Sequence, residues 1–84
     1  MFFVYVLYSK KYDKIYIGYT SDLEKRFQSH NELGIKGWTI HFRPWEIIYT
    51  EQHDSKLEAM KREKQLKSYQ GRLFIRKLIK NRAE

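Results

Sequence analysis

The residues that could take part in chemistry are two tyrosines, an arginine, a histidine and a glutamate, spread over most of the chain. Tyr5 and Tyr16 lie in two apolar stretches near its start. Arg26 and His30 follow at a spacing of four, which brings both side chains to one side of a helix. Glu63 projects near the centre of the loose apolar face of a later helix. Taken together, these residue types match what hydrolysis of a phosphodiester bond requires.

Each residue type has a distinct part in such a reaction. A carboxylate such as Glu63 is a hard oxygen ligand for Mg²⁺, which keeps most of its waters in proteins. The metal can offset the charge that develops on the leaving oxygen. Arginine presents a planar fork that fits a phosphate and stays charged, and a tyrosine or histidine can position a water or carry its proton. Gly18 leaves room for a backbone phosphate to approach the sheet.

Each group also has a plain structural interpretation, which is favoured when the group is taken singly. Two tyrosines on one strand face usually pack against their neighbours, and Gly18 could mark a bulge. A lone histidine such as His30 is more often a hydrogen-bonded core residue than a catalyst. Glu63 could pair with Lys67 one helical turn later, which is worth only about 0.3–0.5 kcal/mol on an exposed helix.

The start of the chain predicts the strands that would carry the tyrosines. Residues 2–9 are apolar or aromatic on both faces, as in a central strand. Residues 10–13 predict a turn and residues 14–20 a second strand, so the short connection makes an antiparallel hairpin. Opposed residue numbers then sum to an odd number, which places Tyr5, Tyr16 and Gly18 on one face.

A first helix is expected directly after the hairpin. Ser21 and Glu24 have the Ser-x-x-Glu spacing of a capping box, and Gly34 is a suitable C-cap. One side of this helix would carry Leu23, Phe27, His30 and Leu33 or Gly34. Residues 35–43 have no clear period and are expected to form a loop.

The second half predicts one more strand and two helices. Residues 45–51 indicate a third strand after Pro44. Ser55 and Glu58 form a second capping box, and the helix that they start is expected to run to about Tyr69, with Gly71 as its stop. Its apolar face would consist of Leu57, Ala59, Met60 and Leu66. Residues 72–82 predict a last helix with an apolar stripe of Phe74, Ile75, Leu78 and Ile79.

The composition limits the class of protein. A chain of 84 residues is enough for one small domain, so residues 1–84 are expected to form a single unit. The chain has no cysteine, which excludes disulfides and zinc-thiolate sites. No apolar run approaches the length of a membrane span, and the N-terminal stretch lacks the basic start and cleavage site of a signal peptide. We therefore expect a cytoplasmic protein.

The positive charge is concentrated at one end of the chain. The net charge is +7, and residues 1–55 balance, so the whole excess lies in residues 56–84. A solvated helix face is one interpretation. A one-sided excess more often marks a surface for a polyanion, with nucleic acid ahead of anionic lipid.

The motifs resemble those of the GIY-YIG nuclease family. They are Val4-Tyr5-Val6, then Tyr16-Ile17-Gly18, the run DLEKRFQSHN, and residues 59–67, AMKREKQLK. The chain is most similar to the small, stand-alone members, which share a third strand like RPWEIIY, here residues 43–49. The first motif has Val-Tyr-Val in place of Gly-Ile-Tyr, and we expect no appended DNA-recognition domain.

The resemblance implies an α/β (α+β) fold with a three-stranded antiparallel sheet flanked by helices. It implies that Tyr5 and Tyr16 are the two motif tyrosines, that Arg26 contacts phosphate, and that His30 supports catalysis. It also implies that Glu63 binds one divalent ion, Mg²⁺ or Mn²⁺. The expected activity is metal-dependent endonuclease cleavage of nucleic acid, with structured or damaged DNA and DNA repair as the setting.

The expected partner is nucleic acid, with no membrane and no obligate protein partner. Besides the open surface at Gly18, its backbone phosphates would contact cations of the last two helices, namely Lys61, Arg62, Lys64, Lys67, Arg72 and Arg76. Two alternatives stay open. One is a nucleic-acid-binding module with the nuclease fold and weak or no catalysis. The other is a regulatory domain whose basic helices meet an acidic protein.

Overall fold

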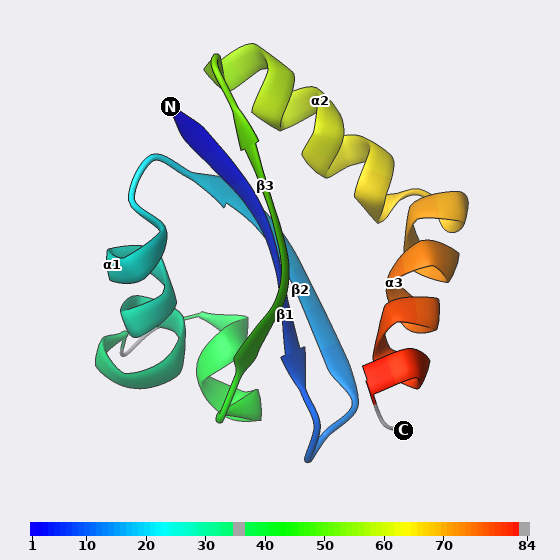
Figure 1. Ribbon diagram of the computed structural model, residues 1–84. Helices are drawn as coiled ribbons and strands as arrows, with labels where there is room; N and C mark the ends of the chain where they lie inside the picture. The colour runs from blue at the N-terminus through cyan, green and yellow to red at the C-terminus, as the bar shows by residue number, and fades with distance from the viewer. Residues whose placement is uncertain (35–36, 83–84) are drawn as a thin grey trace.

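The fold is a three-stranded antiparallel sheet between two layers of helices (Figure 1). The computed structural model describes residues 1–34 and 37–82. The strands are β1 (Phe2–Ser9), β2 (Lys14–Thr20) and β3 (Glu46–His53), in the spatial order β2-β1-β3. Helix α1 (Leu23–Gln28) lies on one side of the sheet, and α2 (Lys56–Lys67) and α3 (Tyr69–Arg82) lie on the other. The expected fold class is confirmed.

The central strand is apolar on both faces because each face is covered. Val4 and Val6 pack with Leu66 of α2 and Ile75 of α3 in one core cluster. Tyr5 and Leu7 point to the other face and pack with Trp45, Leu23 and Phe27, among others. The side chains that alternate along β1 therefore serve two separate cores, one for each helical layer.

The predicted hairpin register is confirmed. Tyr5 lies opposite Gly18 and Leu7 lies opposite Tyr16, so both tyrosines and the glycine share a face. The pairing of β1 with β2 is regular through Gly18, which removes the bulge interpretation of that glycine. The one irregularity of β1 is a register shift between Val6 and Leu7 in its pairing with β3.

The first helix differs from the sequence expectation in its cap and its winding. Its N-cap is Asp22, not Ser21, because the Asp22 carboxylate accepts the Lys25 backbone N–H at 3.1 Å. After Gln28 the chain continues as a wider π-helix, Ser29–Leu33. The change of winding alters the projection beyond Gln28, and Leu33, expected on the apolar side, is 68% exposed.

The prediction of an irregular loop over residues 35–43 is wrong for its described part. Trp38–Phe42 form a 3₁₀-helix, a structure too short to show a period in the sequence. Gly37 precedes it with φ of 104°, a conformation that favours glycine. Residues 35 and 36 lie outside the described residues.

The predicted stop at Gly71 is also wrong. Helix α2 ends at Lys67, and Gly71 lies inside α3 because Ser68 begins the new helix: its Oγ accepts the Gly71 N–H at 3.3 Å. A Cβ at Gly71 would stand 2.4 Å from the Leu66 Cα. Glycine is needed here for close approach of the two helices. The Ser55 cap of α2 is confirmed, since its Oγ accepts the Glu58 N–H at 3.2 Å.

The apolar faces of the last two helices are narrower than expected. Ala59, Leu66 and Ile75 are buried, whereas Leu57 is 68% exposed and Met60 is 43% exposed. Helix α2 therefore buries only Ala59 and Leu66, and polar residues described below also lie near the sheet.

Candidate active site

A cavity of about 510 Å³ lies where the edge strand β2 passes between α1 and α2. Tyr5 of β1 and Tyr16 of β2 line it, with Arg26 of α1 and Glu63 of α2. Its remaining lining residues are Phe2, Gly18, Tyr19, Thr20, Ser21 and Lys56. Residues from four elements, up to 61 positions apart in the chain (from Phe2 to Glu63), thus border one space.

The room beside Gly18 is filled by the ring of Tyr5. A Cβ built at Gly18 would stand 2.6 Å from the Tyr5 hydroxyl oxygen and 3.2 Å from a Tyr16 ring carbon. Tyr5 is 1% exposed, and its ring packs in a core cluster with Leu7 and Trp45. Gly18 therefore allows the phenol to lie flat across β2 with its hydroxyl at the cavity.

His30 stands behind the tyrosines and does not line this cavity. Its Nε2 is 3.0 Å from the Tyr5 hydroxyl, and its Nδ1 is 3.1 Å from the Thr39 hydroxyl. Its ring also packs on Tyr16, with 4.5 Å between the ring centroids. Tyr5, His30 and Thr39 form a chain of two hydrogen bonds that begins at the cavity.

The surroundings of the hydrogen-bonded Tyr5 and His30 favour the neutral form of both side chains. Burial raises the pKa of the Tyr5 hydroxyl far above its usual value, and the neighbouring Tyr16 adds to the effect. Burial lowers the pKa of His30, with further lowering by the positive charges of Arg26 and Arg43. At neutral pH Tyr5 is therefore a phenol that can donate its proton, and His30 is an imidazole that can accept it.

The position of His30 depends on Arg43, which the sequence reasoning did not single out as a functional residue. The Arg43 guanidinium donates to the backbone oxygens of His30 at 2.7 Å, Ser29 at 3.1 Å and Gly34 at 2.6 Å. Ser29 and His30 begin the π-helix and Gly34 is its C-cap, so Arg43 holds the two ends of this turn together. The Ser29 oxygen also accepts the Gly34 backbone N–H at 2.8 Å. Thr39, the other partner of His30, was missed because its segment was expected to be a loop. The RPWEIIY motif, which begins at Arg43, was the only signal that pointed toward this arginine.

Glu63 presents the carboxylate of the cavity. Its side chain is 21% exposed, and Lys67 lies 3.2 Å from its Oε1. Among the described residues, no three or more His, Cys, Asp or Glu side chains are grouped so that they could hold a metal ion by themselves. Most ligands of a divalent ion at Glu63 would thus be water and phosphate oxygens, as is usual for Mg²⁺. A polar cavity of this size has room for such a hydrated ion.

Arg26 is exposed at the rim of the cavity. None of the salt bridges among the described residues includes it. Its guanidinium can therefore bind an incoming phosphate without first breaking an ion pair.

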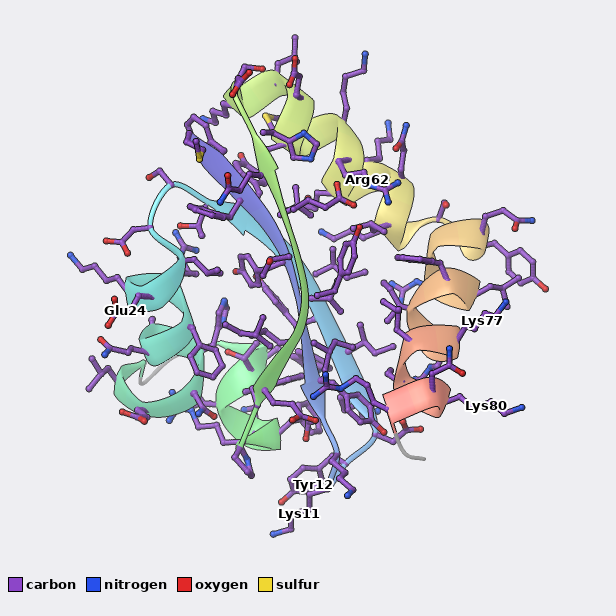
Figure 2. The ribbon with its side chains drawn as sticks, viewed as in Figure 1. Lys11, Tyr12, Glu24, Arg62, Lys77 and Lys80 are labelled. Carbon is purple, nitrogen blue, oxygen red and sulfur yellow. The ribbon has the colours of Figure 1, made fainter. Side chains whose placement is uncertain are left out.

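The cations predicted to contact nucleic acid fall into two groups: those already bonded to another group of the protein, and those that belong to no salt bridge of the described residues. Arg62 of α2, labelled in Figure 2, donates to the Glu51 carboxylate of β3 at 2.9 and 3.0 Å. Tyr49 and His53 bond the same carboxylate. Arg76 bonds Asp13 at 2.6 Å. Lys67 forms a salt bridge with Glu63, and the Arg72 guanidinium donates to the Lys67 backbone oxygen. Lys61 and Lys64 are exposed and belong to no salt bridge of the described residues.

Comparisons with known proteins agree with the resemblance seen in the motifs. The chain matches the family described as the GIY-YIG catalytic domain over residues 1–77. A UPF0213 protein of Staphylococcus saprophyticus is 36% identical over 67 residues, which cover 80% of each chain. A UPF0213 protein of Staphylococcus aureus is 35% identical over 80 residues, 95% of each chain. No solved structure matches the chain.

A membrane-spanning helix needs about 20 mostly apolar residues. Within residues 1–34 and 37–82, no helix is both long enough and apolar enough to cross a bilayer.

Proposed function

The chain belongs to the GIY-YIG family, whose members are generally nucleases, and we propose that it is a metal-dependent endonuclease that cleaves structured or damaged DNA. The observation that carries the proposal is the shared cavity of Tyr5, Arg26 and Glu63. It offers a proton acceptor, a phosphate ligand and a hard oxygen ligand around a space that can admit a phosphodiester.

Arg26 would bind the scissile phosphate and stabilise its charge as the attacking oxygen approaches. Preorganised charge of this kind is the main contribution a protein makes to phosphoryl transfer. Tyr16 borders the same space and would position the phosphate against Tyr5.

Tyr5 and His30 would move the proton of the attacking water. The Tyr5 oxygen accepts that proton as its own passes to His30 Nε2 over the 3.0 Å hydrogen bond. The water oxygen forms a bond to phosphorus, and the bond from phosphorus to the leaving oxygen breaks. His30 ends as an imidazolium, whose other nitrogen faces the Thr39 hydroxyl. A neutral Tyr5 suits this role because it carries a proton to pass on.

Glu63 would hold one divalent ion, Mg²⁺ or Mn²⁺, which supplies charge stabilisation at the phosphate and the leaving oxygen. Lys67 occupies the Glu63 carboxylate through a partly exposed ion pair. Such a pair contributes only about 0.3–0.5 kcal/mol, so a divalent ion can displace the ammonium.

The test compares Glu63→Gln with Glu58→Gln, a control on an exposed glutamate of the same helix. Cleavage of nicked, branched and single-stranded DNA is followed with Mg²⁺, with Mn²⁺ and with chelator. We expect metal-dependent cleavage by the wild type and the control, and a loss of at least a hundredfold in Glu63→Gln. A wild type that cleaves none of these substrates, or a Glu63→Gln variant that cleaves equally well, contradicts the proposal.

A second candidate is a nucleic-acid-binding module without strong catalysis. The observation that favours it is the Lys67 ammonium bound at the carboxylate that a metal would need. This candidate predicts binding that weakens with salt, in the absence of any metal-dependent cleavage.

A further inference from the structure

A second, smaller hollow of about 210 Å³ adjoins the cavity described above. Tyr16 and Arg26 line both spaces, and the smaller one is completed by His30, Trp38 and Thr39, among others. A strand whose phosphate lies at Arg26 would therefore place its neighbouring nucleotide at this hollow. None of the roles proposed above uses the indole of Trp38.

Trp38 is a large apolar side chain that remains 48% exposed. Its ring is supported on the protein side by Phe42, at 4.6 Å between ring centroids, and by Trp45, at 5.9 Å. Trp45 is itself buried, and its Nε1–H donates to the Thr39 backbone oxygen at 2.8 Å. The indole is thus held in place by fixed neighbours while a large part of its surface stays open to solvent.

The aromatic surface continues toward the β1–β2 turn and carries positive charge. Tyr12 packs edge-on to Phe42, at 5.6 Å between ring centroids, and is 42% exposed. The Nζ of Lys14 lies 5.5 Å from the centroid of the Phe42 ring, and the Nζ of Lys11 lies 5.3 Å from that of Tyr12. Figure 2 shows Lys11 and Tyr12 together at the tip of this turn. Exposed aromatic rings interleaved with lysines are the surface on which single-stranded nucleic acids bind.

We propose that Trp38 is a stacking site for an unpaired nucleobase, next to the phosphate at Arg26, so that the substrates are nucleic acids with locally unpaired nucleotides. The inference rests on the proposed function for the position of that phosphate. A base inside a duplex has both faces covered by its neighbours and cannot stack on Trp38. A nucleotide at a flap, gap, loop or single strand can do so, while Lys11 and Lys14 contact the phosphates that follow.

Binding is tested without cleavage, in the presence of chelator, with an oligothymidine and with a blunt duplex of the same length. The chain has two tryptophans, and Trp45 is 3% exposed, so quenching of fluorescence by the oligothymidine reports on Trp38. Affinities of variants are measured by anisotropy of labelled strands. Trp38→Leu keeps an apolar side chain against Phe42 and removes the aromatic face, whereas Trp38→Phe keeps an aromatic face. Tyr69→Ala is the matched control, since Tyr69 is a 74% exposed aromatic on α3.

We expect quenching of the wild type by the oligothymidine. Trp38→Leu should weaken binding of the single strand about tenfold to a hundredfold and change binding of the duplex less than about twofold. Trp38→Phe should retain most of the affinity, and Tyr69→Ala all of it. Absence of quenching, or equal losses of single-strand and duplex affinity in Trp38→Leu, overturns the inference.

The outcome is separable from that of the nuclease test. Selective loss of single-strand binding in Trp38→Leu supports the stacking site even if no substrate is ever cleaved, in which case the proposed function alone fails. Metal-dependent cleavage by a Trp38→Leu variant with unchanged preference for unpaired substrates supports the nuclease and overturns the stacking site.

Discussion

At the scale of single residues, the site depends on the absence of a side chain at Gly18. Tyr5 and Tyr16 could be placed on one face from the hairpin length alone, because strand pairing has a fixed period of two. The sequence also singled out Gly18, but as an opening for a phosphate. The Tyr5 ring fills that opening in the fold, and no sequence pattern predicts which neighbour occupies the space above a glycine.

Gly18→Ala should therefore reduce both stability and activity. The new methyl group would overlap the Tyr5 hydroxyl, and overpacking of this kind costs about 1–3 kcal/mol. Urea unfolding measures the stability, and cleavage assays measure the displacement of the phenol. In a Tyr5→Ala background the same change should cost much less, because the overlapping ring is gone. Equal costs in the two backgrounds would show that the ring is not what limits position 18.

The fall of the cleavage rate at acidic pH should reflect protonation of His30. Its pKa lies below the ordinary value of about 6.5, so cleavage should stay constant from about pH 8 down to about pH 6.5 and fall at lower pH as His30 gains a proton. Tyr5 should add no alkaline limb in this range, since its pKa is raised. His30→Gln should lower the rate and remove the acid limb. An unchanged limb in this variant would assign it to another group.

The free energy of unfolding should also depend on the protonation of His30. The unfolded chain protonates His30 at about pH 6.5, whereas the folded chain, in which the pKa of His30 is lowered, does so only at lower pH. The unfolded state then binds more protons in this window, and the free energy of unfolding decreases as pH falls through it. Urea titrations of the wild type should show this slope, and those of His30→Gln should show less of it.

At the scale of elements, long periodic segments were predictable and short irregular ones were not. The hairpin, the third strand and the Ser55 cap follow from alternation and capping chemistry. The π-helix and the 3₁₀-helix escape such reasoning because each is only about one turn long. Gly71 was misjudged because glycine also serves close helix packing. The missed elements hold His30 and Thr39, so the least predictable part of the chain supports the site.

Arg43 links these irregular elements and gives a prediction about them. Arg43→Lys keeps the charge, but one ammonium cannot reproduce the planar fork that spans three carbonyls of the π-helix and its end. We expect a decrease of about 1–3 kcal/mol in unfolding free energy. Cleavage should fall further than stability explains, because His30 loses its fixed position behind Tyr5.

Lys25→Ala is a suitable comparison for Arg43→Lys, since Lys25 is an exposed cation on α1. Wild-type stability in Arg43→Lys would mean that the carbonyls find other partners, such as water.

At the scale of the whole molecule, the charge that the sequence located in the last third is partly neutralised by folding. Arg62, Arg76 and Arg82 pair with acidic residues from β3, the β1–β2 turn and β3 respectively. Lys77 and Lys80 project from the side of α3 that is turned away from the sheet (Figure 2). The sequence could count these cations but could not tell which ones meet a carboxylate in the fold, because those partners are distant in the chain.

This division of the cations gives a prediction about binding. Lys61→Gln combined with Lys64→Gln should make duplex binding less dependent on salt, with a log–log slope that is shallower by about 0.9 for each phosphate that is no longer neutralised. Affinities between about 50 and 200 mM salt measure that slope. Arg62→Gln should leave it nearly unchanged and instead lower the melting temperature, because it strands Glu51 in its half-buried cluster. The opposite pattern would identify Arg62 as the residue that binds phosphate.

Among the strands of residues 1–34 and 37–82, the phenol at position 5 belongs to the one that is hydrogen-bonded along both edges and covered on both faces. Such a strand opens only when the entire domain comes apart, so the backbone that carries this hydroxyl does not fray locally. Heat should thus keep the Tyr5 ring buried until the cooperative melt itself. Exposure of this ring and denaturation would then be a single event.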